Sequence, residues 1–233
     1  MENMKKKDTR VAIIDNSIDK NIYDPVSHWN SFLDVAWSSF QAKESHFPVD
    51  LEKDFTHVIL TGSEATIMER PQWVLDEVEF VKRAASKKIP ILGSCYGHQM
   101  IALALAGSKS VQRSCLPEIG WIPIKIIKDS TILGKERLFF SFTIHYDEVI
   151  GVGSDFDVLA STPLCSVHAF QKKETPVWGI QSHPEISPDS GKILLKKLIK
   201  EGRGPIDIYN KAYHSLPKDS GIIKYVVDAF VNY

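Results

Sequence analysis

Cys95 lies in the segment of this chain whose residue types are best suited to covalent chemistry. Residues 91–100 read Ile-Leu-Gly-Ser-Cys-Tyr-Gly-His-Gln-Met, a short apolar strand, a Gly-x-Cys-x-Gly turn and the start of an apolar helical run. A strand that turns sharply into a helix needs small residues on both sides of the tip, because the backbone there is strained and crowded. The turn lifts one side chain above the sheet edge, where the positive end of the helix dipole favours a thiolate. The pattern predicts a nucleophile elbow, although taken alone it fits a small buried cysteine equally well.

A second polar segment follows another apolar strand. Residues 177–185 read Val-Trp-Gly-Ile-Gln-Ser-His-Pro-Glu. Pro184 cannot donate to a sheet ladder, so the strand should stop beside His183. In an extended segment, His183 and Glu185 point to the same side. The carboxylate can then bind one imidazole nitrogen while the other faces a thiol. Alone, this segment is more simply a turn with a solvated carboxylate; paired with the elbow, it predicts a Cys95–His183–Glu185 triad.

The two segments together resemble the two signature motifs of the class I glutamine amidotransferases. Residues 93–99 and 179–185 carry the resemblance, and their order along the chain is that of the family. Three weaker similarities lie at residues 58–63, 118–121 and 145–148, so the resemblance runs from about residue 10 to residue 185. It implies an amide hydrolase that cleaves glutamine or a γ-glutamyl amide through a thioester on Cys95 and releases ammonia or an amine.

The resemblance also implies which residues surround the triad. The backbone N–H of Tyr96 and the loop at Gly62 would form the oxyanion hole that stabilises the tetrahedral intermediate. Gln99 lies one helical turn after Cys95, so its amide can share the same helix face. The predicted substrate-binding residues are Ser63, Gln99, His145 and Tyr146.

No metal and no cofactor are predicted. The histidines show no spacing typical of metal ligands. Cys165 and His168 are three residues apart on a predicted strand, which would place them on opposite faces.

Composition limits the class of protein. The chain has 233 residues, of which 43% are hydrophobic and 24% charged, as expected of one large soluble α/β domain over residues 1–233. Its net charge of −1 implies no general attraction to nucleic acid or to anionic membranes. No run approaches the about 18 apolar residues of a membrane span, and the basic run at residues 5–7 precedes too few apolar residues for a signal peptide.

Cysteine usage indicates the compartment. Three cysteines, an odd and low number, favour free thiols and a cytoplasmic location. Beyond Cys95, both Cys115 and Cys165 lie in strand-like segments and are expected to be buried packing residues.

Apolar patterning predicts the elements that must position these residues. We expect a three-layer α/β fold, with a mostly parallel sheet, helices on both faces and a small antiparallel extension. The expected parallel strands are residues 11–15, 56–60, 89–93 and 177–181; the expected helices are residues 29–40, 71–85, 96–106, 187–199 and 222–230; the expected antiparallel strands are residues 121–127, 138–142, 157–161 and 166–170. Sites in parallel sheets collect beyond the strand C-terminal ends, where Gly62, Cys95 and His183 all lie.

Three functions remain open at this point. The chain could supply ammonia to a separate synthase subunit, since it has no Gly-rich phosphate loop of its own. It could instead be a stand-alone γ-glutamyl hydrolase, which is favoured somewhat by Ser63, Ser182 and Tyr146, because they depart from residues common in the family and alter the pocket. A catalytically silent binding module is the third and least favoured interpretation.

Overall fold

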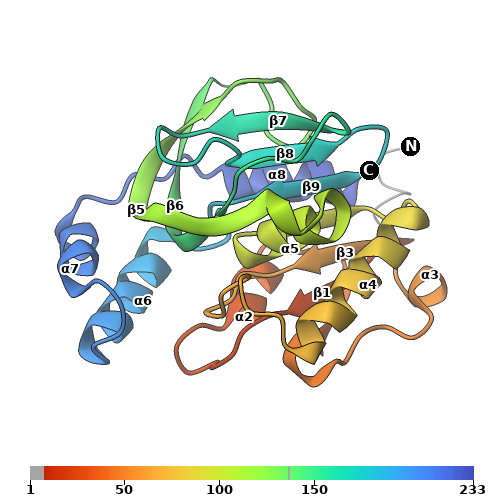
Figure 1. The fold of residues 1–233 in the computed structure, drawn as a ribbon, viewed down its shortest axis with the longest axis horizontal. Helices are drawn as coiled ribbons and strands as arrows, with labels where there is room; N and C mark the ends of the chain where they lie inside the picture. Colours follow the sequence, from red (N-terminus) through yellow and green to blue (C-terminus); the bar gives the residue numbers. More distant parts are fainter. Residues whose placement is uncertain (1–7, 136) are drawn as a thin grey trace.

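The strands form one mixed sheet in this computed structural model, which describes residues 8–135 and 137–233. The basic run at residues 5–7 lies outside the described residues. The strand order is β2-β1-β3-β4-β9-β8-β7-β5-β6 (Figure 1). The strands are β1 (Arg10–Asp15), β2 (Ala36–Gln41), β3 (His57–Leu60), β4 (Ile91–Ser94), β5 (Val111–Ile126), β6 (Leu138–Val149), β7 (Phe156–Ser161), β8 (Ala169–Lys172) and β9 (Val177–Ile180).

The first five strands in this order, β2 to β9, are parallel and carry helices on both faces. Alternate residues of β1 enter opposite cores: Ala12 and Ile14 pack with α4 (Gln72–Ser86) and α5 (Tyr96–Ala106), whereas Val11 and Ile13 pack with α2 (Pro25–Asn30) and α8 (Ile222–Val231). Burial on both faces explains why these strands read as continuous apolar runs. The predicted three-layer α/β fold is confirmed.

The other four strands, β8, β7, β5 and β6, pair antiparallel and continue the same sheet. The long hairpin of β5 and β6 is covered at one end by α6 (Pro188–Lys200) and α7 (Ile206–His214), which enclose a third apolar cluster (Figure 1). The predicted antiparallel extension is thus present as an integral part of the sheet. The remaining elements are short: α3 (Leu51–Asp54), η1 (Ala42–Glu44) and η2 (Ser108–Ser110).

The helix predicted over residues 29–40 is wrong for all but its first two residues. Helix α2 ends at Asn30, where the Ser31 hydroxyl donates a 2.7 Å hydrogen bond to the His28 carbonyl, and residues 36–41 form the edge strand β2. The apolar residues there fit a helical period, but the backbone pairs with β1, and Trp37 is 38% exposed. Tertiary pairing therefore overrides the local pattern.

The described cysteines are all free thiols, but only Cys95 and Cys165 are buried. The expectation that Cys115 is a buried packing residue is wrong. The register of β5 against β6 shifts between Arg113 and Glu118, which breaks the inward–outward alternation and leaves Cys115 facing solvent. Over the described ranges, no helix combines the length and apolar character needed to cross a bilayer.

Glu77 on α4 gives a prediction about stability. Its carboxyl group is fully buried, and burial raises its pKa to about 8. Because this pKa lies above the value of about 4.3 in the unfolded chain, the protonated carboxyl group contributes to the stability of the fold. This contribution is fully present below about pH 4.3 and is lost as the pH rises through about 8. Glu77→Gln removes this titration, so its free energy of unfolding should exceed that of the wild type by several kcal/mol at high pH, up to about 5 kcal/mol.

Denaturant unfolding of both proteins between pH 5 and pH 9 measures this difference, which should shrink toward zero at the acidic end. The exposed Glu79 on the same helix provides the control, since Glu79→Gln should leave the pH dependence unchanged. Parallel curves for wild type and Glu77→Gln would contradict the prediction.

Candidate active site

Cys95 lies at the junction of β4 and α5, as predicted. It is the N-cap of α5, with φ 50° and ψ −106°, a conformation that side-chain-bearing residues rarely adopt. Its backbone N–H donates a 2.9 Å hydrogen bond to the Ile180 carbonyl, and its carbonyl accepts from the Gln99 N–H at 3.1 Å. These bonds hold the turn on both sides, and the strained backbone is the kind found at functional sites.

The glycines on either side of the elbow are required by close packing. A Cβ on Gly93 would lie 2.4 Å from the Gly97 carbonyl carbon, and a Cβ on Gly97 would lie 2.2 Å from the Leu60 carbonyl oxygen. Only glycine allows α5 to approach β3 and β4 so closely. The Gly-x-Cys-x-Gly pattern therefore has a direct steric cause.

His183 and Glu185 lie beyond the end of β9, and both are buried. His183 Nδ1 is 2.9 Å from Glu185 Oε1. An ionised carboxylate only accepts hydrogen bonds, so Nδ1 carries the hydrogen and Nε2 is left for another partner. The backbone N–H of His183 donates to the Phe142 carbonyl at 2.8 Å, which links this segment to β6.

The electrostatic surroundings of His183 favour its charged form. Burial by itself lowers the pKa of His183, but the negative charges of Cys95 and Glu185 outweigh it and raise the pKa to about 10. The charged form of His183 is therefore favoured beside the Cys95 side chain, a placement that suits the predicted nucleophile.

A cavity of about 370 Å³ opens above the elbow and is lined by Cys95 and His183. The predicted residues Ser63, Tyr96, Gln99, His145 and Tyr146 also line it. Gly62 lies two residues beyond β3 and next to His183, since a Cβ there would lie 2.6 Å from His183 Cε1. The structure thus brings the predicted residues together, while their contacts with a substrate stay predictions.

Gln99 and Tyr146 are fixed by protein contacts within this wall. The Gln99 amide nitrogen donates to the Asp147 carbonyl at 2.7 Å and to Gln181 Oε1 at 3.2 Å. The Tyr146 hydroxyl is hydrogen-bonded to that of Tyr209 on α7. Both side chains are therefore held in place before any ligand binds.

Sequence reasoning missed two residues that contact the triad. The Tyr23 hydroxyl donates to Glu185 Oε1 at 3.3 Å and lies 3.3 Å from His183 Nδ1. The Ser94 hydroxyl donates to the same carboxylate oxygen at 3.2 Å. The position of Ser94 beside Cys95 was a signal that could have indicated its role. Tyr23 follows β1 and lies far from both motifs in the sequence. The only signal that could have indicated it is the rule that sites gather beyond strand C-terminal ends.

Gly62 provides a test of this geometry. In Gly62→Ala the new methyl group would meet His183 Cε1 at 2.6 Å and the Tyr23 hydroxyl at 2.9 Å, so the imidazole must shift. We expect kcat for amide hydrolysis to fall about 10²-fold, as small misplacements of reacting groups do, with little change in melting temperature. Steady-state kinetics with a thermal melt measure both quantities. Unchanged kcat would show that His183 tolerates the displacement.

Comparisons with known proteins agree with this geometry. Residues 12–200 match the family described as glutamine amidotransferase class-I. The chain is similar to a glutamine-hydrolysing GMP synthase subunit from Saccharolobus solfataricus, with 36% identity over 142 residues that cover 60% of this chain and 73% of the relative. The corresponding subunit from Methanococcus aeolicus is 38% identical over 120 residues, which cover 50% of this chain and 62% of that protein.

Solved structures show the same fold. A glutamine amidotransferase from Thermotoga maritima superposes with a TM-score of 0.74 at 18% identity, covering 97% of this chain and 99% of that one. A protein from Thermoplasma acidophilum, described as a GMP synthase subunit, gives a TM-score of 0.65 at 22% identity, covering 87% of this chain and 94% of that one. The resemblance inferred from the two motifs is confirmed, and so is the prediction of an amidotransferase enzyme. The chain belongs to the class I glutamine amidotransferase family of enzymes.

Proposed function

We propose that this chain hydrolyses the side-chain amide of L-glutamine through a Cys95–His183–Glu185 triad and supplies the released ammonia to a separate synthase subunit. The observation that carries the proposal is the 2.9 Å contact of His183 Nδ1 with Glu185 Oε1, in a cavity that Cys95 and His183 line together. The order nucleophile, base, orienting carboxylate is that of a triad.

The proposed reaction has two halves. The Cys95 thiolate attacks the amide carbonyl carbon, and the oxygen of the tetrahedral intermediate accepts hydrogen bonds from the backbone N–H groups of Tyr96 and Gly62. The His183 imidazolium gives its proton to the leaving nitrogen, and ammonia departs from a Cys95 thioester. Water then attacks the thioester with His183 as general base, which releases glutamate and restores the thiolate. Glu185 holds the imidazole in orientation throughout.

The names of the relatives support an ammonia acceptor. Both are subunits of a glutamine-hydrolysing GMP synthase, and the word subunit implies at least one further chain in those proteins. We extend this to the present chain and propose a synthase of that kind as its partner. We further propose that residues 1–233 form one domain, since the described strands share one sheet. The free thiols support a reducing compartment, for which we propose the cytoplasm.

A second candidate is a stand-alone hydrolase of γ-glutamyl peptides or amides. The cavity favours it, because its volume of about 370 Å³ is in the range that encloses drug-sized ligands. Beyond the triad, the cavity continues to an apolar wall of Leu194, Leu198 and Tyr209 from α6 and α7. Such a wall would accommodate a leaving amine larger than ammonia.

Release of glutamate and of ammonia or amine by the purified chain distinguishes these functions. The substrates are L-glutamine and a small panel of γ-glutamyl peptides, with Cys95→Ala as the control. Low turnover of glutamine alone, with covalent labelling of Cys95 by a glutamine-mimicking electrophile, supports a subunit that requires its synthase. Efficient unaided turnover with peptides preferred supports the stand-alone hydrolase. If the chain shows no turnover and Cys95 is not labelled, both functions are refuted and a silent module is favoured.

A further inference from the structure

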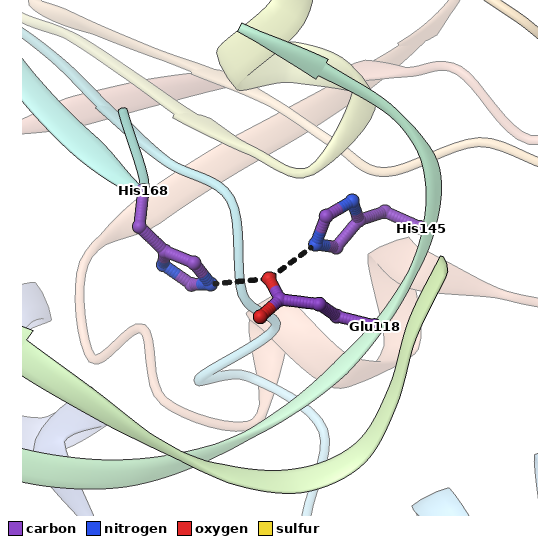
Figure 2. A group of neighbouring side chains, drawn as sticks. All are labelled: Glu118, His145 and His168. Atoms are coloured by element: carbon purple, nitrogen blue, oxygen red, sulfur yellow. Dashed lines mark hydrogen bonds and ion pairs between the residues drawn. The ribbon is translucent and has the colours of Figure 1, made fainter. Parts of the chain in front are cut away.

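Three buried side chains outside the triad converge behind the cavity wall. Glu118 comes from β5, His145 from β6 and His168 from the residue before β8 (Figure 2). His145 Nε2 lies 3.0 Å from Glu118 Oε2, and His168 Nε2 lies 3.9 Å from the same oxygen. One ligand atom of each residue falls within 4.8 Å of the other two. All three are at most 6% exposed, so this group is shielded from solvent.

The hydrogen bonds of His145 determine which of its ring nitrogens carries a hydrogen. Its Nδ1 is 3.1 Å from the Asp147 carbonyl oxygen, which can only accept, so Nδ1 carries a hydrogen. In a neutral ring, Nε2 then carries no hydrogen, and its lone pair faces Glu118 Oε2, which lies 3.0 Å from Nε2. Two acceptors at this distance repel each other unless a proton or a cation lies between them.

His168 distinguishes these two alternatives. A proton shared by Glu118 and His145 would give that pair a hydrogen bond, but it would leave the His168 ring without a partner. Within the described residues, neither ring nitrogen of His168 has a hydrogen-bond partner, although the side chain is fully buried. Burying a polar group without a partner is costly. A cation bound between the three residues would give the carboxylate oxygen and one nitrogen of each histidine a common partner.

The surrounding contacts are those of an oriented ligand set. Thr162 donates to the other carboxylate oxygen, Glu118 Oε1, at 2.6 Å, so that Oε2 is turned toward the two imidazoles. The Asp147 carbonyl orients His145 from the opposite side. Such outer contacts, from a backbone carbonyl to histidine and from a hydroxyl to carboxylate, usually accompany metal ligands.

We propose that Glu118, His145 and His168 bind a divalent transition-metal cation, with Zn²⁺ as the best fit. Two imidazoles and one carboxylate are a common three-ligand set for zinc, with the fourth tetrahedral position left for water. Metal–ligand distances of about 2.1 Å place neighbouring ligand atoms about 3.4 Å apart in a tetrahedral site. The two imidazole nitrogens lie 3.0 Å and 3.9 Å from Glu118 Oε2 here, and no two of the three ligand atoms are more than 4.8 Å apart. Side-chain shifts below about 1 Å complete the site.

The site differs from the sequence expectation of no metal for a structural reason. Two of the ligands come from separate strands and the third from the loop before β8, so their spacing along the chain shows no metal motif. A bound ion would tie β5, β6 and the loop before β8 together. Because His145 and Tyr146 both line the cavity, the ion would stabilise that wall.

Titration of the metal-free full chain with Co²⁺ and Zn²⁺ tests the proposal. The experiment uses Cys95→Ala protein, so that the candidate nucleophile cannot act as a ligand. We expect one equivalent of Co²⁺ to give a visible d–d absorption spectrum, and one equivalent of Zn²⁺ to displace it. Glu118→Gln and His168→Gln should each weaken Zn²⁺ binding at least about 100-fold, more than loss of an outer contact. Competition with a chromophoric chelator measures this affinity.

His57→Gln is the matched control. His57 is another buried histidine, and its Nε2 also has no hydrogen-bond partner among the described residues, but it lies on β3 beside Phe230. This variant should keep full Zn²⁺ affinity. Absence of a Co²⁺ spectrum in Cys95→Ala protein would overturn the proposal even if the cluster variants fail to fold. Unchanged affinity in folded Glu118→Gln or His168→Gln, or equal loss in His57→Gln, would also overturn it.

Discussion

Replacing Cys95 with serine should lower kcat for L-glutamine hydrolysis by about 10⁴-fold or more, while the melting temperature changes little. The thiol and hydroxyl are similar in size, so the fold should accept the substitution. The chemistry should not, because a serine hydroxyl is far less acidic than a thiol and must lose its proton to a base as it attacks. The substitution also removes the Cys95 charge that helps to raise the pKa of His183, so the charged pair on which the proposed reaction depends is lost.

Steady-state release of glutamate measures the effect, with the preferred γ-glutamyl amide in place of glutamine if the chain selects one. Cys115→Ser is the matched control, since Cys115 is exposed on β5 and should be dispensable. Activity of Cys95→Ser within tenfold of wild type, or electrophile labelling at Cys115 or Cys165, would disprove the assignment of Cys95 as nucleophile.

Gly97→Ala should destabilise the chain by about 4 kcal/mol or more, a large part of the about 5–15 kcal/mol by which a typical domain is stable. The added Cβ would lie 2.2 Å from the Leu60 carbonyl oxygen and 2.7 Å from its carbon. These are backbone atoms of β3, which pairs with β1 on one side and β4 on the other, so they cannot move away singly. The clash must displace α5 or break the sheet.

Soluble yield, circular dichroism and denaturant unfolding measure this loss. Gly151→Ala is the comparison variant, because a Cβ there meets nothing within 4 Å. Its stability should stay within about 0.5 kcal/mol of wild type. A Gly97→Ala protein that unfolds at the same denaturant concentration as Gly151→Ala would show that the elbow can relax, and that its glycine serves another purpose.

The parallel core and the close approach of the candidate triad residues could be predicted because their signals are local. Each buried strand is a short apolar run, and the elbow is a contiguous motif that ends one such run. His183 and Glu185 are two residues apart, so the extended backbone alone places them on one side. Knowing that parallel strands end at the same sheet edge was then enough to bring Cys95 and His183 together.

Most of the predictions that failed have a different cause, because the structure there depends on contacts with distant parts of the chain. Trp37 and Phe40 follow a helical period, yet they belong to a strand because β1 offers an open edge. Helix α7 escaped prediction because it is short and contains weak helix formers such as Asp207 and Asn210. Tyr23 contacts Glu185 across 162 positions of sequence, a proximity that no local pattern encodes.

The backbone conformation at Cys95 lowers the stability of the fold while it holds the thiol at the position that the proposed reaction needs. Its φ of 50° and ψ of −106° are accessible to glycine but cost a side-chain-bearing residue about 1–3 kcal/mol. The same chain with glycine at position 95 should therefore be the more stable protein. Selection for backbone stability alone would favour glycine there, so the presence of a cysteine fits the role in the reaction that we propose for its thiol. Any thermostabilised variant of this chain should be checked first at position 95, where stability and activity are in direct conflict.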